Sequence, residues 1–84
     1  MMRPSHTFHV AGLLIRAAPG RVADVARHLA AVPGLQVHAE DKRTGRIVVT
    51  LETASIEEQE AQFAWVRTLR EVRAVDLVCH YFES

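Results

Sequence analysis

The sequence predicts an α+β domain in which two helices cover one face of a four-stranded antiparallel sheet and leave the other face open. Four stretches have the apolar, β-branched content or the two-residue alternation typical of strands. Two stretches have the apolar spacing of amphipathic helices, and each lies between two predicted strands. The length of 84 residues supports one modest core. We therefore expect a single domain over residues 1–84, with an ordered core at about 6–83.

The first half of the chain predicts a strand followed by a helix. Residues 8–15 are largely apolar, which is typical of a strand covered at least partly on both faces. Pro19 is expected near the first helical position, where its missing N–H would have no partner. Apolar residues at helical spacing over 22–29 predict the first helix. Pro33-Gly34 ends it, because proline disfavours helical backbone at the residue before it.

Three further strands are expected over residues 35–40, 46–53 and 75–82, where apolar and polar residues alternate. A hairpin turn over 41–45 joins the first two of these strands. The strand over 46–53 has the densest apolar pattern and is expected near the centre of the sheet.

The second helix is predicted from a capping box at Ser55 and Glu58. The Ser55 hydroxyl would accept a hydrogen bond from the Glu58 N–H, while the Glu58 carboxylate would accept one from the Ser55 N–H. The helix is expected to run to about Arg70. Trp65 and Leu69 would flank its buried stripe, which consists of Ile56, Phe63 and Val66.

The predicted order, β-α-β-β-α-β, consists of two βαβ units joined by a hairpin, which is the ferredoxin-like arrangement. Right-handed crossovers put the first and third strands in the middle of the sheet and the other two at its edges. Both helices pack on one sheet face. A chain of this length has nothing left to cover the other face, so the function is expected there.

Alternation places four apolar side chains on this open face, namely Val10, Leu14, Val48 and Val78. Such a patch is typical of a binding surface, although self-association or simple β-propensity would also account for it. An amphipathic, basic helix would find apolar contact in the middle of the face and carboxylates at its edge. The candidate binding residues are Val10, Gly12, Leu14, His38, Val48, Thr50, Glu52, Asp76, Val78 and His80. Ordinary solvation near a strand end is the alternative explanation for Glu52 and Asp76.

Composition narrows the class of partner and the compartment. Ten Lys and Arg residues balance ten Asp and Glu residues, so no bulk positive charge favours nucleic acid. The open face also lacks the stacking aromatics of an RNA-binding domain of this topology. The single cysteine, Cys79, forms no intramolecular disulfide, and no stretch has the pattern of a cleavable signal or a membrane span. We expect a cytoplasmic protein.

Metal and catalytic sites are not predicted, and no cofactor is expected. His6, His9, His38 and the pair Cys79-His80 are the candidate metal ligands, but their spacing is wrong for one coordination shell. Cys79 and His80 are adjacent in a strand and should point to opposite faces, Cys79 towards the helices. No nucleophile with an orienting partner is visible, and the loop over 16–21 lacks a glycine-rich phosphate cradle. The chain is therefore expected not to be an enzyme.

The ordered set of these features resembles the NapD family over nearly the whole chain. The resemblance rests on five segments: the run over 12–17, the helix with Arg21 and Leu29, the Pro33-Gly34 stop followed by Val37, the Gly45 turn into 47–49 with Glu52, and the closing run over 77–80.

The resemblance implies a cytoplasmic assembly chaperone of the periplasmic nitrate reductase. Such a protein would hold the twin-arginine signal peptide of the catalytic subunit as a helix on the open sheet face. It would restrain export until the molybdenum cofactor has been inserted. Two departures stand out: Cys79 where members commonly carry an aromatic residue, and Glu71 where glycine is usual, so that the second helix is expected to run on slightly.

The choice between two functions and the oligomeric state both stay open. The same topology serves small-molecule-sensing domains of the ACT or Lrp-effector type, which usually form dimers with a ligand at the interface. This is the alternative function. The chaperone hypothesis predicts a monomer or weak dimer with the signal peptide as its partner.

Overall fold

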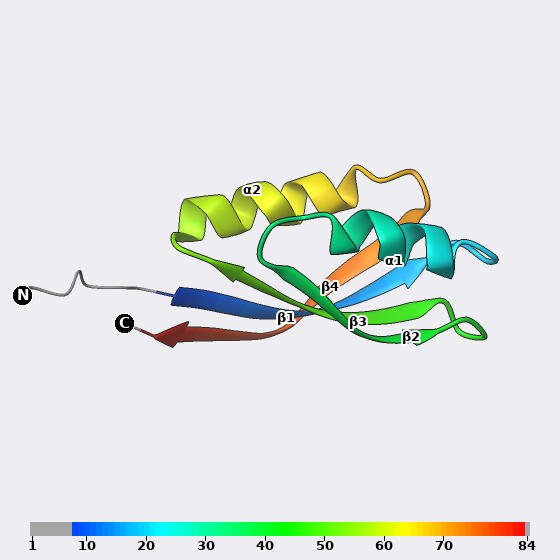
Figure 1. Ribbon diagram of the computed structural model, residues 1–84, viewed down its shortest axis with the longest axis horizontal. Helices are drawn as coiled ribbons and strands as arrows, with labels where there is room; N and C mark the ends of the chain where they lie inside the picture. Colours follow the sequence, from blue (N-terminus) through cyan, green and yellow to red (C-terminus); the bar gives the residue numbers. More distant parts are fainter. Residues whose placement is uncertain (1–7, 84) are drawn as a thin grey trace, which may run out of the picture.

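The structure, a computed structural model, describes residues 8–83 (Figure 1). Residues 6 and 7 of the expected core, and with them His6, lie outside the described residues. The first and last strands of the chain are longer than predicted, since the first extends two residues further and the last begins three residues earlier. The elements are β1 (Phe8–Ala17), α1 (Val22–Ala30), β2 (Leu35–Asp41), β3 (Arg46–Thr53), α2 (Ile56–Arg67) and β4 (Val72–Glu83).

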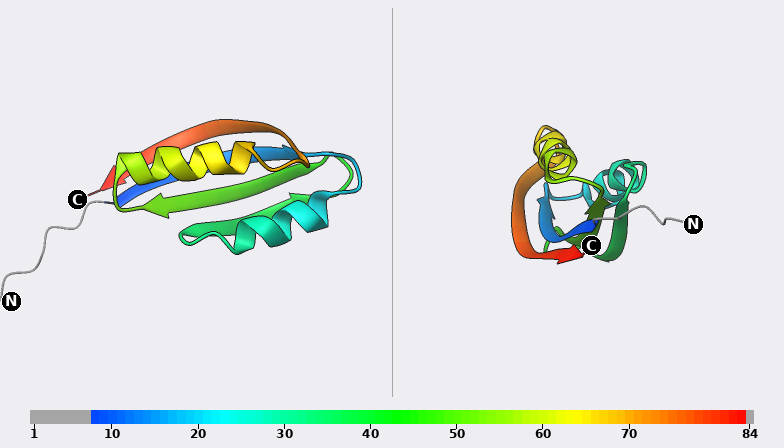
Figure 2. Two further views of the ribbon diagram at one scale, coloured as in Figure 1. Left: turned by 90° about the horizontal axis from the view of Figure 1, so that it is seen from above. Right: turned by 90° about the vertical axis from the view of Figure 1, so that its left-hand side faces the viewer.

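The four strands form one sheet in the order β2-β3-β1-β4, and all three neighbouring pairs are antiparallel. β1 and β3 occupy the centre, as the right-handed crossovers predict. Both helices lie on the same face of the sheet, as the end-on view in Figure 2 shows. The ferredoxin-like α+β fold is confirmed.

The core fills the space between the sheet and the helices. Every second residue of β1 and β3 points into it, and α1 buries one continuous stripe. α2 contributes less, because its only buried residues are Gln59 and Val66. The largest fully buried side chains are Leu13, Ile15, Val25, Leu29, Ile47, Val49, Leu51 and Val66.

The start of α1 differs from the prediction. Pro19 lies three residues before the helix, which begins at Val22 with Arg21 as an N-cap whose side chain makes no capping hydrogen bond. Gly20 has φ +78° and turns the chain between β1 and the helix. Pro19 therefore lies in this turn and does not occupy the first helical position.

The start of α2 confirms half of the capping box. The Glu58 N–H donates to the Ser55 hydroxyl over 3.1 Å, but the Glu58 carboxylate accepts from the Ala54 N–H over 3.0 Å and not from that of Ser55. The helix ends at Arg67, three residues before the predicted end. At this end the N–H groups of Thr68 and Leu69 donate to carbonyls three residues back, and the Thr68 hydroxyl also donates to the Trp65 carbonyl, so the helix stops before Glu71.

The hairpin between β2 and β3 is built around Asp41. Its carboxylate accepts from the N–H groups of Arg43 and Thr44 over 3.0 and 3.3 Å. These bonds favour the ionised form, so that chiefly the Thr44 N–H holds the pKa of Asp41 below its usual value. Gly45 completes the turn with φ +81°.

The central and outer strand pairs differ in regularity. β1 and β3 pair without interruption from His9 with Thr53 to Arg16 with Arg46. β4 carries an extra residue at Val78, because Gly12 faces Cys79 while Leu13 faces Leu77. β2 carries one at His38, between the pairs Val37 with Val49 and Ala39 with Val48. Beyond each extra residue, the two faces of the outer strand are exchanged relative to simple alternation.

Candidate functional site

The two central strands form the middle of the open face. The pairs Val10 with Glu52, Gly12 with Thr50, and Leu14 with Val48 stand directly opposite one another. All six residues alternate with the buried core positions of their strands, as predicted. Val48 is 45% exposed although it lies in a central strand, so the apolar centre of the face is accessible.

The outer strands extend this face on both sides. On β2, the His38 Nε2 lies 2.7 Å from the Thr50 Oγ1, which places the imidazole on the open face. On β4, Asp76 stands opposite Leu14. The extra residue Val78 is 67% exposed. Nine of the ten candidate residues therefore gather on or beside one surface.

His80 is the exception, and the expectation that it shares the open face is wrong. It stands opposite the buried Ala11, and its ring stacks on that of His9 with centroids 5.5 Å apart. The bulge at Val78 causes this change, because it shifts every later residue of β4 by one position. His80 instead lines a hollow of about 410 Å³ between α2 and β4, together with Ile56, Gln59, Glu60, Phe63, Ala64, Arg67 and Leu77.

Cys79 is displaced by the same bulge, in the opposite sense. It was expected towards the helices, but it is exposed and stands opposite Gly12 on the open face. A Cβ at Gly12 would lie 2.7 Å from the Cys79 Sγ, so the thiol occupies the space above this glycine. Gly12 and Cys79 together form the part of the open face that lies beside Val78.

Besides Cys79, three more residues of this face were missed by sequence reasoning. Arg16 and Arg46 stand opposite each other where the face reaches the hairpin end, and both are exposed. Extending the alternation of the two central strands by one step would have found them. Ala39 faces Val48 because of the bulge at His38, and nothing in the sequence signals that bulge.

The register also separates the two carboxylates of the rim. Glu52 stands opposite Val10 and Asp76 opposite Leu14, four residues further along β1. At about 3.4 Å per residue this is roughly 14 Å. Glu52 and Asp76 therefore occupy separate positions on the rim and are not equivalent.

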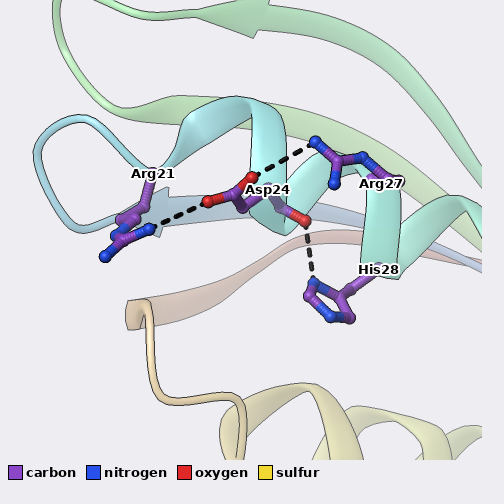
Figure 3. Close-up of polar contacts among 4 residues, drawn as sticks. All are labelled: Arg21, Asp24, Arg27 and His28. Atoms are coloured by element: carbon purple, nitrogen blue, oxygen red, sulfur yellow. Dashed lines mark hydrogen bonds and ion pairs between the residues drawn. The ribbon is translucent and has the colours of Figure 1, made fainter.

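A second cluster of polar side chains among residues 8–83 does not lie beside an apolar sheet surface. On the outer surface of α1, Asp24 accepts from Arg21 over 3.0 Å and from Arg27 over 3.2 Å, and the His28 Nδ1 lies 2.8 Å from the Asp24 carbonyl oxygen (Figure 3). These exposed contacts belong to the helix layer, away from the open face. Within residues 8–83 no three His, Cys, Asp or Glu side chains are grouped to hold a metal ion.

The fold and this face define a class of protein: a small ferredoxin-like domain that presents one apolar, partly acidic sheet surface. No helix in the described part of the chain is long and apolar enough to cross a membrane. The family model described as NapD protein matches residues 8–84. The chain therefore belongs to the NapD family.

Individual relatives agree with this assignment. A protein of Paracoccus pantotrophus named Chaperone NapD is 35% identical over 88% of this chain and 64% of its own length, so the chain spans less than two thirds of that relative. Chaperone NapD of Escherichia coli K12 is 33% identical over 94% of this chain and 92% of its own length. The solution structure of the E. coli Tat proofreading chaperone protein NapD has a TM-score of 0.82 and 31% identity, covering 88% of this chain and 78% of that one. The named relatives are chaperones and not enzymes.

Proposed function

We propose that this chain is a cytoplasmic chaperone of the Tat export pathway. It binds the twin-arginine signal peptide of the catalytic subunit of the periplasmic nitrate reductase on its open sheet face. While bound, the peptide is withheld from export until cofactor insertion is complete. Family membership and the similarity to a Tat proofreading chaperone of known structure support the chaperone role, and they favour it over a small-molecule-sensing domain.

The accessible apolar centre of the open face is the observation that carries the proposal. Val48 lies in a central strand, where a side chain is normally covered, yet it is nearly half exposed. Leu14, directly opposite it, and Val10, further along β1, are partly exposed, and Val78 is exposed on β4. The apolar segment of a signal peptide, folded as a helix, would bury this surface and gain the free energy of removing it from water.

The rim supplies the polar part of the recognition. Glu52 is exposed beside the patch and offers a carboxylate to a guanidinium, which binds in a two-pronged, charge-assisted geometry. His38 is held by Thr50 at the β2 side of the same face. A peptide with two adjacent arginines before an apolar stretch matches this combination of groups.

Calorimetric titration with a synthetic twin-arginine peptide tests the proposal. We expect saturable binding at roughly micromolar concentrations. Replacing both arginines of the peptide by Gln should weaken it at least about tenfold, the loss of one charge-assisted contact. The Val48→Glu variant should abolish binding, whereas Ala23→Glu, at an exposed position of α1, should bind as the unmodified protein does. No binding, or equal binding of the arginine and Gln peptides, would contradict the proposal.

A further inference from the structure

The zero net charge of the chain conceals a strong separation of charge between its two ends. The loops over 18–21, 42–45 and 68–71 all lie at the hairpin end of the molecule, on the right in Figure 1. Eight of the ten Lys and Arg residues lie in these loops or within two residues of them: Arg16, Arg21, Lys42, Arg43, Arg46, Arg67, Arg70 and Arg73. The hairpin end is therefore predominantly basic.

The opposite end is acidic. It is formed by the end of β3, the loop over 54–55 and the first turns of α2. Residues 47–66 contain no Lys or Arg, but they include Glu52, Glu57, Glu58 and Glu60, all of them exposed. An approaching charged ligand therefore meets fields of opposite sign at the two ends.

The same separation follows the open face. Along the central strands, the paired positions change from Val10 with Glu52 to Arg16 with Arg46. Glu52 has no basic partner across the strands, because it faces Val10 on one side and its N–H donates to the Gly34 carbonyl on the other. The arginine pair does have acidic neighbours.

Asp76, the second carboxylate of the face, is a poorer site for a cation because it lies near this arginine pair. Asp41 stands opposite Arg46 on β2. Asp76 lies two residues from Ala74, the β4 partner of Arg16. The field of Arg16 therefore reduces the attraction of Asp76 for a further guanidinium. Glu52 is the carboxylate of this face that is left for a ligand.

From this arrangement we infer the direction in which the peptide lies; the inference rests on the proposed function. The arginine-bearing, N-terminal end of the peptide helix lies over Glu52, and its C-terminal end lies over Arg16 and Arg46. The helix thus runs parallel to β1. The carboxylate at its N-terminus and the guanidinium groups at its C-terminus both complement its macrodipole. Six strand residues span about 20 Å, which a helix of about 13 residues covers.

Paramagnetic broadening in NMR spectra of the ¹⁵N-labelled protein tests the direction. The probe is a synthetic peptide with two adjacent arginines before an apolar stretch, spin-labelled at either its N-terminal or its C-terminal end. With the N-terminal label, we expect the strongest broadening at the amides of Gly34, Glu52 and Thr53. With the C-terminal label, it should move to Arg16, Gly45 and Arg46.

Two substitutions provide the matched control. Glu52→Gln should weaken peptide binding about tenfold, the loss of one charge-assisted contact, whereas Asp76→Gln should change it less than about threefold. The reversed broadening pattern, broadening at both ends with either label, or a larger effect at Asp76 would overturn the direction and leave the proposed function intact. Absence of binding by the unmodified protein would overturn both.

Discussion

The two halves of the molecule differ in how completely they are packed. α1 buries a continuous stripe of four residues, whereas the longer α2 buries only two and leaves a hollow above β4. Residues 72–80 of β4 include no fully buried side chain. The comparison shows that strand identity follows from local pattern in both halves. The direction of each side chain follows reliably only in the central strands, which are paired on both edges and bury one face against the helices.

The largest expected difference is between two leucines, one from each half. Leu29 of α1 is fully buried, and Leu29→Ala should lower the free energy of unfolding by about 3 kcal/mol. Leu77 of β4 is 51% exposed, and Leu77→Ala should cost less than about 1 kcal/mol. Urea unfolding measures both. Similar losses in the two variants would contradict the distinction between the halves.

The bulge of β4 can be tested through the contact that it creates. A methyl group at Gly12 collides with the Cys79 thiol, so Gly12→Ala should destabilise the protein by roughly 1 kcal/mol. The loss should disappear when Cys79→Ala is also present, which gives a coupling energy of similar size. The control pair is Gly12→Ala with Val78→Ala, whose effects should add, because Cys79 and not Val78 stands opposite Gly12. If the control couples and the Cys79 pair does not, Val78 stands opposite Gly12 and the register of β4 is that of simple alternation.

Gln59 offers a smaller, stabilising change in the loosely packed half. Its side chain is buried, and its Oε1 has no hydrogen-bond partner among the described residues. Gln59→Leu removes this unsatisfied acceptor and should raise the free energy of unfolding by about 1 kcal/mol. Gln62→Leu, one turn further along α2 and partly exposed, should change it by less than about 0.5 kcal/mol. A loss of stability in Gln59→Leu would show that the amide is satisfied.

The smallest effect is expected at the hairpin of the well-packed half. The pKa of Asp41 is lowered in the folded protein, mainly by the Thr44 N–H, so its ionised form stabilises the fold. The unmodified protein should therefore be more stable than Asp41→Asn above the ordinary value of 3.8. This advantage should be lost as the pH falls through the lowered pKa. Urea midpoints of both proteins over this range measure it, and a difference that persists in acid would refute the assignment.

Most of the fold could be predicted from the sequence, because each element carries its own local signal. The alternation over 46–53 and the Ser55 cap are both found as predicted. The end of α2 was misplaced, because nothing in the pattern of residues 68–70 forbids another turn. The helix closes through contacts of Thr68 and Leu69 that spacing does not reveal.

The candidate site was predictable on the central strands, and on the outer strands only as far as their bulges. Val10, Leu14, Val48 and Glu52 lie as expected because the ladder between β1 and β3 is unbroken. His80 was misplaced because a single inserted residue exchanges the faces of the strand. The residue types at positions 78–80 do not indicate which of them is inserted. Whether these residues contact a peptide is a separate prediction, which calorimetry with the twin-arginine peptide tests.

Both bulges lie in the strands that form the edges of the sheet, β2 and β4. The outer side of such a strand offers unpaired N–H and C=O groups on which a further strand could grow, as in amyloid. A bulge breaks this row into short pieces and increases the local twist. The irregularity that exchanges the faces of β4 thereby also disfavours edge-to-edge aggregation of the sheet.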